Sequence, residues 1–356
     1  MTVTIRDVAS KAGVSASTVS RVLSKSPRIS EETRKTVLRA IRELGYHPNT
    51  MARSLAGGKS NAIGLVLPAS PDTLMDNGFF IRAMTGVALC AQENGFHVMF
   101  SFSKSADEAL ELTQGYVRGQ SVDGVILFFS RKHDPCMDYL KKAGVPFSVI
   151  GKPDEEEDCC WVDNDNRQAT LRAAEYLIAR GHTQIAYLCG PEDYNVSSNR
   201  LDGFRRAMED AVLPIEESLI VKNGQFTSEW GREAVRSLIK SRAAGGKFPT
   251  AIMACDDMQA IGALEAVRGA GIEGVSVIGF NNIPISAYTS PALTTIDVNA
   301  EKLGENAAGL LIEALHGDRG TFRHVIVRST LVERSSVAVL GQEGERGTDL
   351  NGIPGI

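Results

Sequence analysis

The sequence predicts a small all-α domain at the N-terminus, followed by an α/β body that contains two parallel sheets. Three observations support this fold class. The chain has 356 residues, which is too long for one ordinary hydrophobic core. Residues 1–45 divide into short helical patterns with capping residues. From residue 61 onward, β-branched apolar runs alternate with helical patterns, as in sheets that helices cover on both faces.

The N-terminal domain begins with a helix-capping pattern. Thr4 and Asp7 have the spacing of a capping box, and apolar residues then recur at helical spacing until Gly13, which suits a left-handed helix end. Ser15 is placed to cap a second short helix over residues 16–23, and Ser30 to cap a third. Two short helices joined by a glycine-containing turn and braced by a third predict a helix-turn-helix unit.

The predicted second helix has an outward face that suits a DNA groove. Small side chains at its start let the backbone approach the major groove, hydroxyl groups can reach phosphates or base edges, and an arginine can reach a phosphate or a guanine. The residues of this face are Ala16, Ser17, Thr18, Ser20 and Arg21. A three-helix bundle without a ligand is the alternative interpretation.

Charge is distributed unevenly along the chain. Residues 1–60 hold 11 Lys and Arg against 4 Asp and Glu, whereas the remaining residues hold 27 against 39. The head therefore has a formal charge of +7 and the rest of the chain −12. A basic head on an acidic body favours a module that binds a polyanion, although charge alone fits a solvated basic surface equally well.

The body is predicted to hold two sheets, because apolar runs recur with helical patterns between them. The candidate strands are 62–69, 97–103, 123–129, 146–152, 184–190, the 250s, 275–282 and 293–298. In open sheets of this kind, ligands bind beyond the carboxyl ends of the strands.

Polar and aromatic residues cluster at those predicted strand ends. Asp256 and Asp257 follow one strand and Asn281 another, Trp161 lies beside Asp163, and a helix after a further strand carries Arg200. Aromatic surfaces beside bidentate hydrogen-bonding groups suit a small polyhydroxylated ligand. Each residue taken alone fits a helix cap or a surface ion pair better, so their common placement carries this prediction.

Residues 4–58 resemble the headpiece of the lactose-repressor-type (LacI/GalR) family of bacterial transcription regulators, and the resemblance continues to about residue 336. The matching stretches are TIRDVASKAGVSASTVSRVL, RISEETRKTVLRAIRELGYHPN and MARSLAGGKS. The resemblance implies that Ala16 and Ser17 read bases while Thr18, Ser20 and Arg21 contact the groove or backbone. The whole set expected to contact DNA is Thr4, Ser15, Ala16, Ser17, Thr18, Ser20, Arg21, Arg28, Ser30, Asn49, Ala52 and Leu55.

The same resemblance implies that Pro48 to Gly57 is a hinge that becomes a short helix on DNA and meets its copy across a dimer axis. Physically, a proline can start such a helix and Gly57 can end it, but so short a helix is unstable in isolation. Leu55 holds the place of a leucine that enters the central base step, where an apolar wedge kinks the duplex. An ordinary contact of Leu55 with the body is the alternative.

The resemblance also implies that the body is similar to periplasmic sugar-binding proteins, with an effector in a cleft between two subdomains. The residues expected to contact the effector are Phe79, Phe80, Trp161, Asp163, Arg200, Phe226, Asp257 and Asn281. Asn281 and Asn282 stand where many members have acidic residues, and Arg167 replaces a small residue, a departure with no interpretation. The Phe-Asn-Asn sequence points weakly to maltose-type regulators and α-glucosides.

These features predict a domain order. Residues 1–47 form the DNA-binding domain, 48–60 the hinge and linker, and 61–340 an effector-binding and dimerisation domain in which the chain crosses between subdomains near 161 and within 290–325. Residues 341–356 are glycine-rich and aperiodic, which predicts a disordered tail. The expected partners are a near-palindromic double-stranded operator, a carbohydrate-type effector and a second copy of the chain.

Other functional classes find little support in the sequence. The chain has no phosphate-binding loop, nucleophile elbow or zinc motif, and its histidines and cysteines are dispersed, so no enzyme activity, cofactor or metal is expected. The N-terminus lacks the apolar core of a secretory signal, and no apolar run reaches the roughly 20 residues of a membrane span, so a cytoplasmic location is expected. A solute-binding protein and an architectural DNA-binding protein without effector control are the alternative functions.

Overall fold

The computed structural model describes residues 3–23, 26–46, 60–67, 77–154, 159–243, 248–317 and 322–340. The chain divides into two compact units, Met1–Ser60 and Asn61–Ile356. The predicted hinge and the predicted tail lie outside the described residues.

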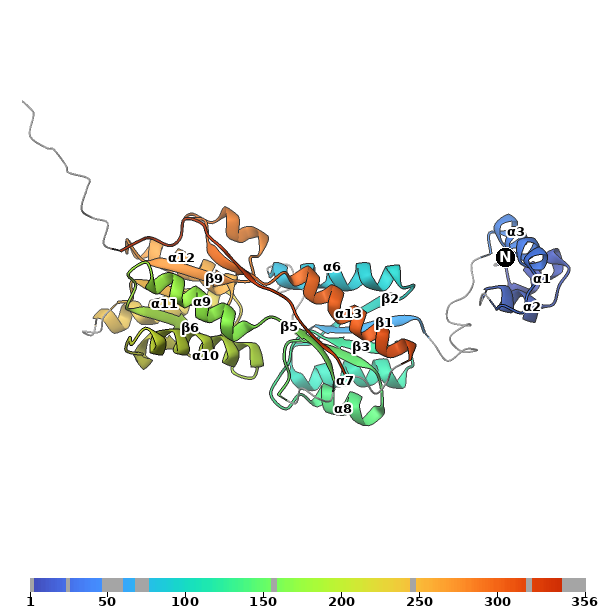
Figure 1. Cartoon of the computed structure of the whole chain (residues 1–356), viewed down its shortest axis with the longest axis horizontal. Helices are drawn as coiled ribbons and strands as arrows, with labels where there is room; N and C mark the ends of the chain where they lie inside the picture. The colour runs from blue at the N-terminus through green and yellow to red at the C-terminus, as the bar shows by residue number, and fades with distance from the viewer. Residues whose placement is uncertain are drawn as a thin grey trace, which may run out of the picture. The chain divides into compact units, whose positions relative to one another are not determined.

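The described part of the first unit consists of α1 (Ile5–Ala12), α2 (Ala16–Leu23) and α3 (Glu31–Leu44), as Figure 1 shows. These helices begin and end where the sequence predicted. Gly13 ends α1 with φ of 64°, in the left-handed region that glycine adopts at little cost. A small core of valine and alanine side chains joins the helices, formed by Val8, Ala9, Val19, Val22, Val37 and Ala40.

The first sheet of the second unit has the strand order β11-β5-β4-β3-β1-β2, and all its described pairings are parallel. Its strands are β1 (Ala62–Leu67), β2 (His97–Phe102), β3 (Gly124–Leu127), β4 (Phe147–Ile150), β5 (Cys160–Asp163) and β11 (His324–Ile326). Helices α6 (Gly78–Glu93) and α13 (Ala300–His316) cover one face, and α7 (Ala106–Arg118) and α8 (Pro135–Ala143) cover the other.

The second sheet has the order β12-β10-β9-β8-β6-β7. Its strands are β6 (Ile185–Leu188), β7 (Ile220–Val221), β8 (Ala251–Ala254), β9 (Ser276–Phe280), β10 (Thr294–Asp297) and β12 (Thr330–Val332). Helices α9 (Asn166–Ile178) and α10 (Asn195–Asp210) cover one face, and α11 (Ser228–Ala243) and α12 (Asp257–Gly269) the other. Short 3-10 turns occur at η2 (Glu217–Leu219) and η3 (Pro284–Tyr288).

The two-sheet prediction is confirmed, with one difference. β12 pairs antiparallel with β10, at one edge of the second sheet. The sequence offered no signal for β12, β11 or β7, because strands of two or three residues at a sheet edge are too short to show an apolar run.

Within the described residues, the chain passes between the two sheets at 163–166, 297–300 and 326–330. These crossings lie side by side at the centre of the second unit in Figure 1. They join two subdomains, each consisting of one sheet and the helices that cover it. None of the helices in the described part of the chain is both long and apolar enough to cross a bilayer.

Candidate functional site

A cavity lies between the two subdomains, where the carboxyl ends of the central strands of both sheets meet. About 480 Å³ of space lies between its lining residues, and part of that space is open solvent. Its lining consists of Asn77, Phe79, Phe129, Ile150, Gly151, Asp163, Asn164, Asn166, Val196, Arg200, Phe226, Asp256, Asn281 and Leu303.

Aromatic rings from both subdomains line one side of the cavity. Phe79, at the start of α6, stacks on Phe129, which follows β3, with ring centroids 6.3 Å apart and planes 11° apart. Phe226 approaches Phe129 from the second subdomain at 6.3 Å. Tyr194 completes this group, because its ring lies 4.7 Å from that of Phe129. Phe79, Phe129 and Phe226 therefore give a ligand an apolar surface built from three separate segments, and Tyr194 packs against it from outside the lining.

Arg200 on α10 is the one cationic side chain among the described lining residues, and it is buried. Its Nε donates to Oδ1 of Asn166 at 2.8 Å, and Nη1 donates to the carbonyl of Cys255 at 2.6 Å. The guanidinium lies 3.6 Å from the ring centroid of Phe280, which holds its plane. Nη2 makes only a long contact of 3.5 Å, to Oδ1 of Asn281, and so retains donor capacity for a ligand.

Asp163 ends β5 and presents a buried carboxyl group to the cavity. It accepts hydrogen bonds from the backbone N–H of Lys152 at 3.0 Å, from the backbone N–H of Asn164 at 2.8 Å and from Nδ2 of Asn166 at 2.8 Å. Burial raises the pKa of Asp163 to about 6, although these donors and Arg200 act in the opposite direction. Asp163 is therefore mostly ionised at pH 7 and can accept from a ligand hydroxyl.

Asp256 connects both sides of the cavity. It caps α12 by accepting from the backbone N–H of Met258 at 2.7 Å. Its Oδ2 accepts from Nδ2 of Asn281, in the same subdomain, at 2.9 Å, and from Nδ2 of Asn77, in the other subdomain, at 3.2 Å. Burial raises the pKa of Asp256. This carboxyl group thus belongs to the helix, the cavity and the contact between subdomains.

Asn164 holds the three crossings of the chain together. It lies in the first crossing, and its Nδ2 donates to the carbonyl of Val298 in the second at 3.0 Å and to that of Val327 in the third at 2.7 Å. Because Asn164 also lines the cavity, the connection between subdomains and the ligand site share a residue.

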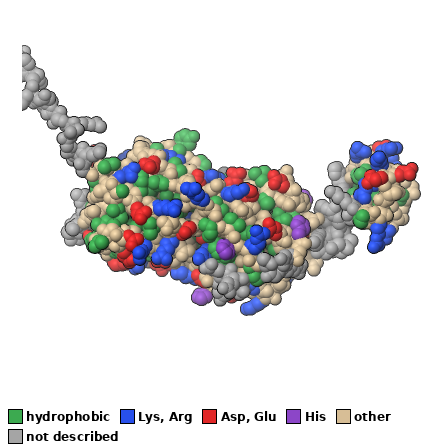
Figure 2. Space-filling view, viewed as in Figure 1, with side chains coloured by type: hydrophobic (Ala, Val, Ile, Leu, Met, Phe, Trp, Pro, Cys, Tyr) green, Lys and Arg blue, Asp and Glu red, His purple; other side chains and the backbone are tan. Residues whose placement is uncertain are grey.

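In the first unit, α2 presents a polar face to solvent. Ser17, Ser20 and Arg21 are exposed, and Ala16 and Thr18 are partly exposed, whereas Val19 and Val22 on the opposite face are buried. Lysine and arginine side chains are visible on this unit in Figure 2, along with a few acidic ones. An exposed short helix with small, hydroxyl and cationic side chains fits the recognition helix of a helix-turn-helix.

Comparisons with known proteins agree with this reading. Residues 4–49 match the model for bacterial regulatory proteins of the lacI family, and residues 174–337 match a periplasmic binding protein-like domain. The transcriptional regulator CelR of Thermobifida fusca is 34% identical over 338 residues, which cover 94% of this chain and 98% of CelR. The chain belongs to the lacI family.

Other members of the family are similar over nearly the whole chain. The regulator MalR of Staphylococcus xylosus is 30% identical over 342 residues, covering 95% of this chain and 99% of MalR. Among solved structures, a CelR–cellobiose complex is 32% identical with a TM-score of 0.73, covering 94% of this chain and 99% of that one. The lac repressor dimer bound to operator is 25% identical with a TM-score of 0.81, covering 95% and 100%.

Membership makes the chain a DNA-binding transcription regulator with an effector-binding body, and not an enzyme. These parts of the sequence-based prediction are confirmed. The family assignment alone leaves the effector and the individual contact residues open.

The structure of this lacI-family regulator brings most of the predicted effector residues to one cavity. Phe79, Asp163, Arg200, Phe226 and Asn281 all line it. They come from both subdomains and were selected from segments far apart in the sequence.

Three predicted effector residues lie outside the cavity lining. The ring of Phe80 packs in the core against Phe128 and Phe129. Trp161 lies two residues before the end of β5, and its indole stacks on His324 with centroids 4.6 Å apart. Trp161 precedes the end of its strand and so does not reach the open edge of the sheet, whereas Phe80 is a residue of α6 whose ring faces the core.

Asp257 is the third. Its Oδ1 accepts from Oγ1 of Thr295 at 2.5 Å and its Oδ2 accepts from the backbone N–H of Ile283 at 2.9 Å, so it holds the loop after β9. Burial, together with the neighbouring carboxyl group of Asp256, raises the pKa of Asp257 to about 8. Of the two consecutive aspartates, Asp256 is the one in the cavity.

The lining residues that the predicted effector set lacks are Asn77, Phe129, Ile150, Gly151, Asn164, Asn166, Val196, Asp256 and Leu303. The sequence already placed Asp256 at a strand end, and a polar residue between a strand and a helix is suited to cap that helix. Asn77 is a cap of the same kind, preceding α6 and accepting from the backbone N–H of Phe79 at 3.2 Å. Phe129 carried no polar signal.

The predicted DNA contacts in the described residues divide into caps and surface residues. Oγ of Ser15 accepts from the backbone N–H of Thr18 at 3.2 Å, and Oγ of Ser30 accepts from that of Thr33 at 3.3 Å. Thr4 donates from its backbone N–H and its hydroxyl to the carboxylate of Asp7, each at 2.8 Å. Arg28 is exposed. Asn49, Ala52 and Leu55 lie outside the described residues.

Proposed function

We propose that this regulator binds a near-palindromic operator as a homodimer, and that an uncharged carbohydrate, with maltose or another α-glucoside as the first candidate, controls its affinity for that operator. The observation that carries the proposal is the composition of the cavity. It combines phenyl rings with buried carboxyl and amide groups and a single arginine among its described residues.

The charge of the cavity favours an uncharged ligand. Two carboxyl groups, Asp163 and Asp256, face one guanidinium, that of Arg200. A phosphorylated or acidic sugar would add a further negative charge that the site does not balance, and an unbalanced buried charge is strongly unfavourable. A neutral sugar avoids this cost and can donate hydroxyl protons to the carboxylates.

The arrangement of the rings supports a sugar in particular. The C–H face of a pyranose is flat and apolar enough to pack on Phe79, Phe129 or Phe226, while the ring hydroxyls meet Asp163, Arg200 and Asn281 at the other side. Among its relatives, one solved structure is a complex of CelR with cellobiose, and another relative is named MalR. Both names are consistent with a neutral glucoside.

An exposed apolar surface in the first subdomain supports a homodimer. Neighbouring elements α6 and β2 expose Ile81, Leu89, Met99 and Phe100, whose exposed fractions lie between 41% and 52%. Exposed apolar side chains on neighbouring elements are typical of protein interfaces, and a second copy would cover β2, which lies at an edge of the described sheet. The lac repressor, which is similar in fold, is a dimer on its operator.

Pairing would also give the DNA-binding units their selectivity. One short helix reads few base pairs, so two units on a palindrome double the readout. The roles of Ala16, Ser17, Ser20 and Arg21 in this readout, and of Leu55 as a wedge, are part of the proposal. With roughly 6–10 phosphate contacts, operator affinity should fall by about 10³–10⁵ between 50 and 200 mM salt.

Calorimetry of the full-length chain tests the proposed ligand class. We expect maltose to bind and to raise the melting temperature of the chain. Cellobiose is the alternative neutral disaccharide, and glucose 6-phosphate is the anionic control. Binding of the phosphorylated sugar without either disaccharide would contradict the charge argument. A gel shift against a randomised palindromic library tests the operator, and no preference over random duplex would contradict the DNA-binding part.

A further inference from the structure

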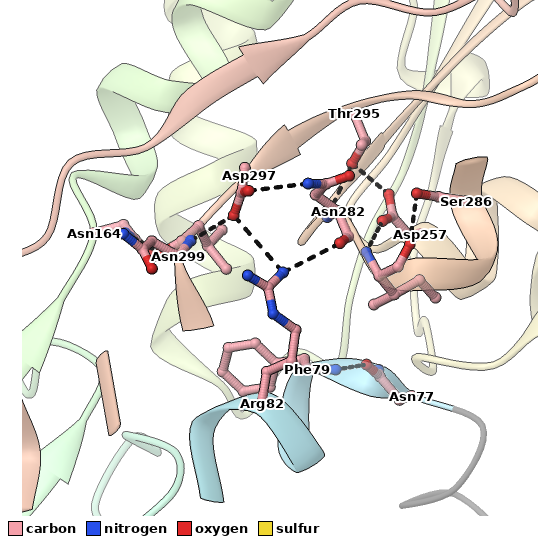
Figure 3. Close-up of polar contacts among 12 residues, drawn as sticks. Asn77, Phe79, Arg82, Asn164, Asp257, Asn282, Ser286, Thr295, Asp297 and Asn299 are labelled. Carbon is pink, nitrogen blue, oxygen red and sulfur yellow. Dashed lines mark hydrogen bonds and ion pairs between the residues drawn. The ribbon is translucent and has the colours of Figure 1, made fainter. Parts of the chain in front are cut away.

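We propose that Arg82 is a latch across the hinge between the two subdomains, through which the state of the cavity controls operator binding. The inference rests on the proposed function for its effector. The latch is formed by Arg82 of the first subdomain and by Asn282 and Asp297 of the second (Figure 3).

Arg82 reaches from α6 to the second subdomain. Its Nη1 donates to the carbonyl oxygen of Asn282 at 3.3 Å and lies 4.0 Å from Oδ1 of Asp297. The side chains of Arg82 and Asp297 are 31% and 25% exposed, so the pair is partly screened by water and can break without leaving a buried charge. A contact of this strength suits a switch better than a permanent brace.

Asp297 is a fixed partner located at the hinge itself. It is the last residue of β10, directly before the crossing that enters α13. Its Oδ1 accepts from the backbone N–H of Asn299 at 2.7 Å, and its Oδ2 accepts from Nδ2 of Asn282 at 2.9 Å. Arg82 therefore binds to a carboxylate whose position follows the backbone of the crossing.

The helix that carries Arg82 moves with the other side of this crossing. Helices α6 and α13 touch at their backbones: a Cβ on Gly86 would lie 1.9 Å from the carbonyl oxygen of Glu301, and a Cβ on Gly304 would lie 1.9 Å from that of Ala83. Such close packing makes the two helices one rigid body. A rotation of the second subdomain about residues 297–300 that moves the loop after β9 would therefore change the distance from Arg82 to Asn282, while Asp297 stays near the axis.

A two-residue turn connects the latch to the cavity. Asn281 and Asn282 follow β9 with φ of 105° and 51°, both in the left-handed region that few residues other than glycine and asparagine adopt. The side chain of Asn281 points into the cavity, where it bonds to Asp256. The next residue offers its carbonyl to Arg82 and its side chain to Asp297 and Arg334. A ligand that draws Asn281 to itself would rotate the peptide that Arg82 holds.

Asn164 provides the contrasting fixed point. Its two hydrogen bonds to the other crossings are buried, so they should persist while the subdomains rotate about them. The hinge thus has an inner pivot at Asn164 and an outer latch at Arg82, both visible in Figure 3.

The test measures coupling in the full-length chain. Operator affinity is determined with and without saturating maltose, or cellobiose where that is the sugar that binds, on a palindromic duplex selected with the wild-type chain. The variants are Arg82→Ala and Arg82→Lys. Arg205→Ala is the matched control, because Arg205 is similarly exposed at 37% but pairs with Glu217 inside one subdomain.

We expect Arg82→Ala to bind the sugar within about twofold of the wild type while the ratio of the two operator affinities falls by about fivefold or more, within the usual range of allosteric coupling. Arg82→Lys should retain part of the coupling, and Arg205→Ala all of it. An unchanged ratio in Arg82→Ala, or an equal loss in Arg205→Ala, would overturn the latch.

A second measurement separates the latch from the proposed ligand class. Hydrogen exchange of the ligand-free chain reports on the backbone N–H groups of Asn282 and Asn299, which donate to Thr295 and Asp297. Arg82→Ala should speed their exchange relative to both wild type and Arg205→Ala. Should neither sugar bind the wild type, the ligand proposal fails, while unchanged exchange in Arg82→Ala would refute the latch by itself.

Discussion

The exposed face of α2 is proposed to bind DNA and the cavity of the body to bind the effector, and these two regions are built in opposite ways. The α2 face comprises Ala16, Ser17, Thr18, Ser20 and Arg21, all within one helix of eight residues. The cavity draws its lining from segments between Asn77 and Leu303. A face on one helix depends on local structure, whereas the cavity depends on two sheets, their helices and three crossings holding their positions.

Because of this difference, we expect a substitution in one region to leave the binding function of the other region intact. A core substitution in the first unit should remove operator binding and leave sugar binding intact, and a substitution in the cavity should do the reverse. The predictions below test that separation, beginning with the largest effect.

Arg200→Ala should be the most damaging change. It removes the cation beside Asp163 and Asp256 and leaves the carbonyl of Cys255 and Oδ1 of Asn166 without their donor. Breaking a buried charge network of this kind costs about 3 kcal/mol or more, measured as the free energy of unfolding of the body in urea.

Arg205→Ala is the control for Arg200→Ala, because it lies on the same helix in an exposed ion pair and should change stability by at most about 0.5 kcal/mol. Equal destabilisation by the two variants would contradict the structural role of Arg200. If Arg200→Ala lost operator binding when no sugar is present, the two regions would not be independent.

Substitutions of Asp257 should have the second-largest effect on the free energy of unfolding, and this effect depends on pH. Asp257→Ala leaves the N–H of Ile283 and the hydroxyl of Thr295 without their acceptor, at a cost of about 2–3 kcal/mol. Asp257→Asn should cost less than about 1 kcal/mol at pH 7, because a carboxyl group with a pKa of about 8 is mostly protonated there and an amide has the same shape.

The sign of the pH dependence follows from the raised pKa. The folded chain holds a proton that the unfolded chain releases near its ordinary pKa of 3.8, so the stability from Asp257 is complete below about pH 4 and is lost as pH rises towards 8. The raised pKa of Asp163 likewise stabilises the folded chain at low pH, and this stabilisation is lost as pH rises to about 6. Between pH 6 and 8, urea denaturation should therefore show a smaller loss of unfolding free energy in Asp257→Asn than in the wild type. Equal losses in the two chains would show that Asp257 is ionised in the folded protein.

Val19→Ala tests the first unit. Val19 is fully buried in a core of only six buried residues, and its truncation should lower the stability of that unit by about 2 kcal/mol. Operator affinity should fall, while calorimetry should find sugar binding unchanged. Leu38→Ala is the control, because Leu38 is 41% exposed. A weakened sugar site in Val19→Ala would break the comparison.

Arg21→Ala tests the α2 face directly. If Arg21 contacts DNA as proposed, its removal should weaken operator binding by about 1 kcal/mol or more, roughly five- to tenfold in a gel shift. Arg39→Ala removes the same charge from the exposed surface of α3 and should have a smaller effect. Equal losses would mean that only the overall positive charge matters.

The smallest effect is expected for Ser30→Ala. Loss of the cap that accepts from Thr33 should lower the stability of the first unit by about 0.5–1 kcal/mol, whereas Ser30→Asp should preserve it. If Ser30 also contacts DNA, operator affinity will fall by more than the loss of stability explains, and Ser30→Asp will not restore it.

The sequence by itself determined the parts of this protein that depend on neighbours in the chain. The caps at Ser15 and Ser30, the turn at Gly13 and the buried stripe of α2 are all interactions over four residues or fewer, so their spacing is readable. The apolar runs of the central strands were equally readable, because a strand buried on both faces needs continuous apolar residues. The strand-end pattern indicated Asp163, Arg200 and Asn281, and the family resemblance added Phe79 and Phe226, all five of which line the cavity.

Only the tertiary structure decided which side chains meet. Asp256 and Asp257 are adjacent and chemically identical, yet one caps a helix at the cavity and the other holds a loop, because successive residues at a helix start point in different directions. Asn164 and Arg82 gained their positions from partners more than a hundred residues away. Local patterns fix where elements begin and end, but contacts between distant segments depend on how whole sheets and helices pack, and no short stretch of sequence contains that information.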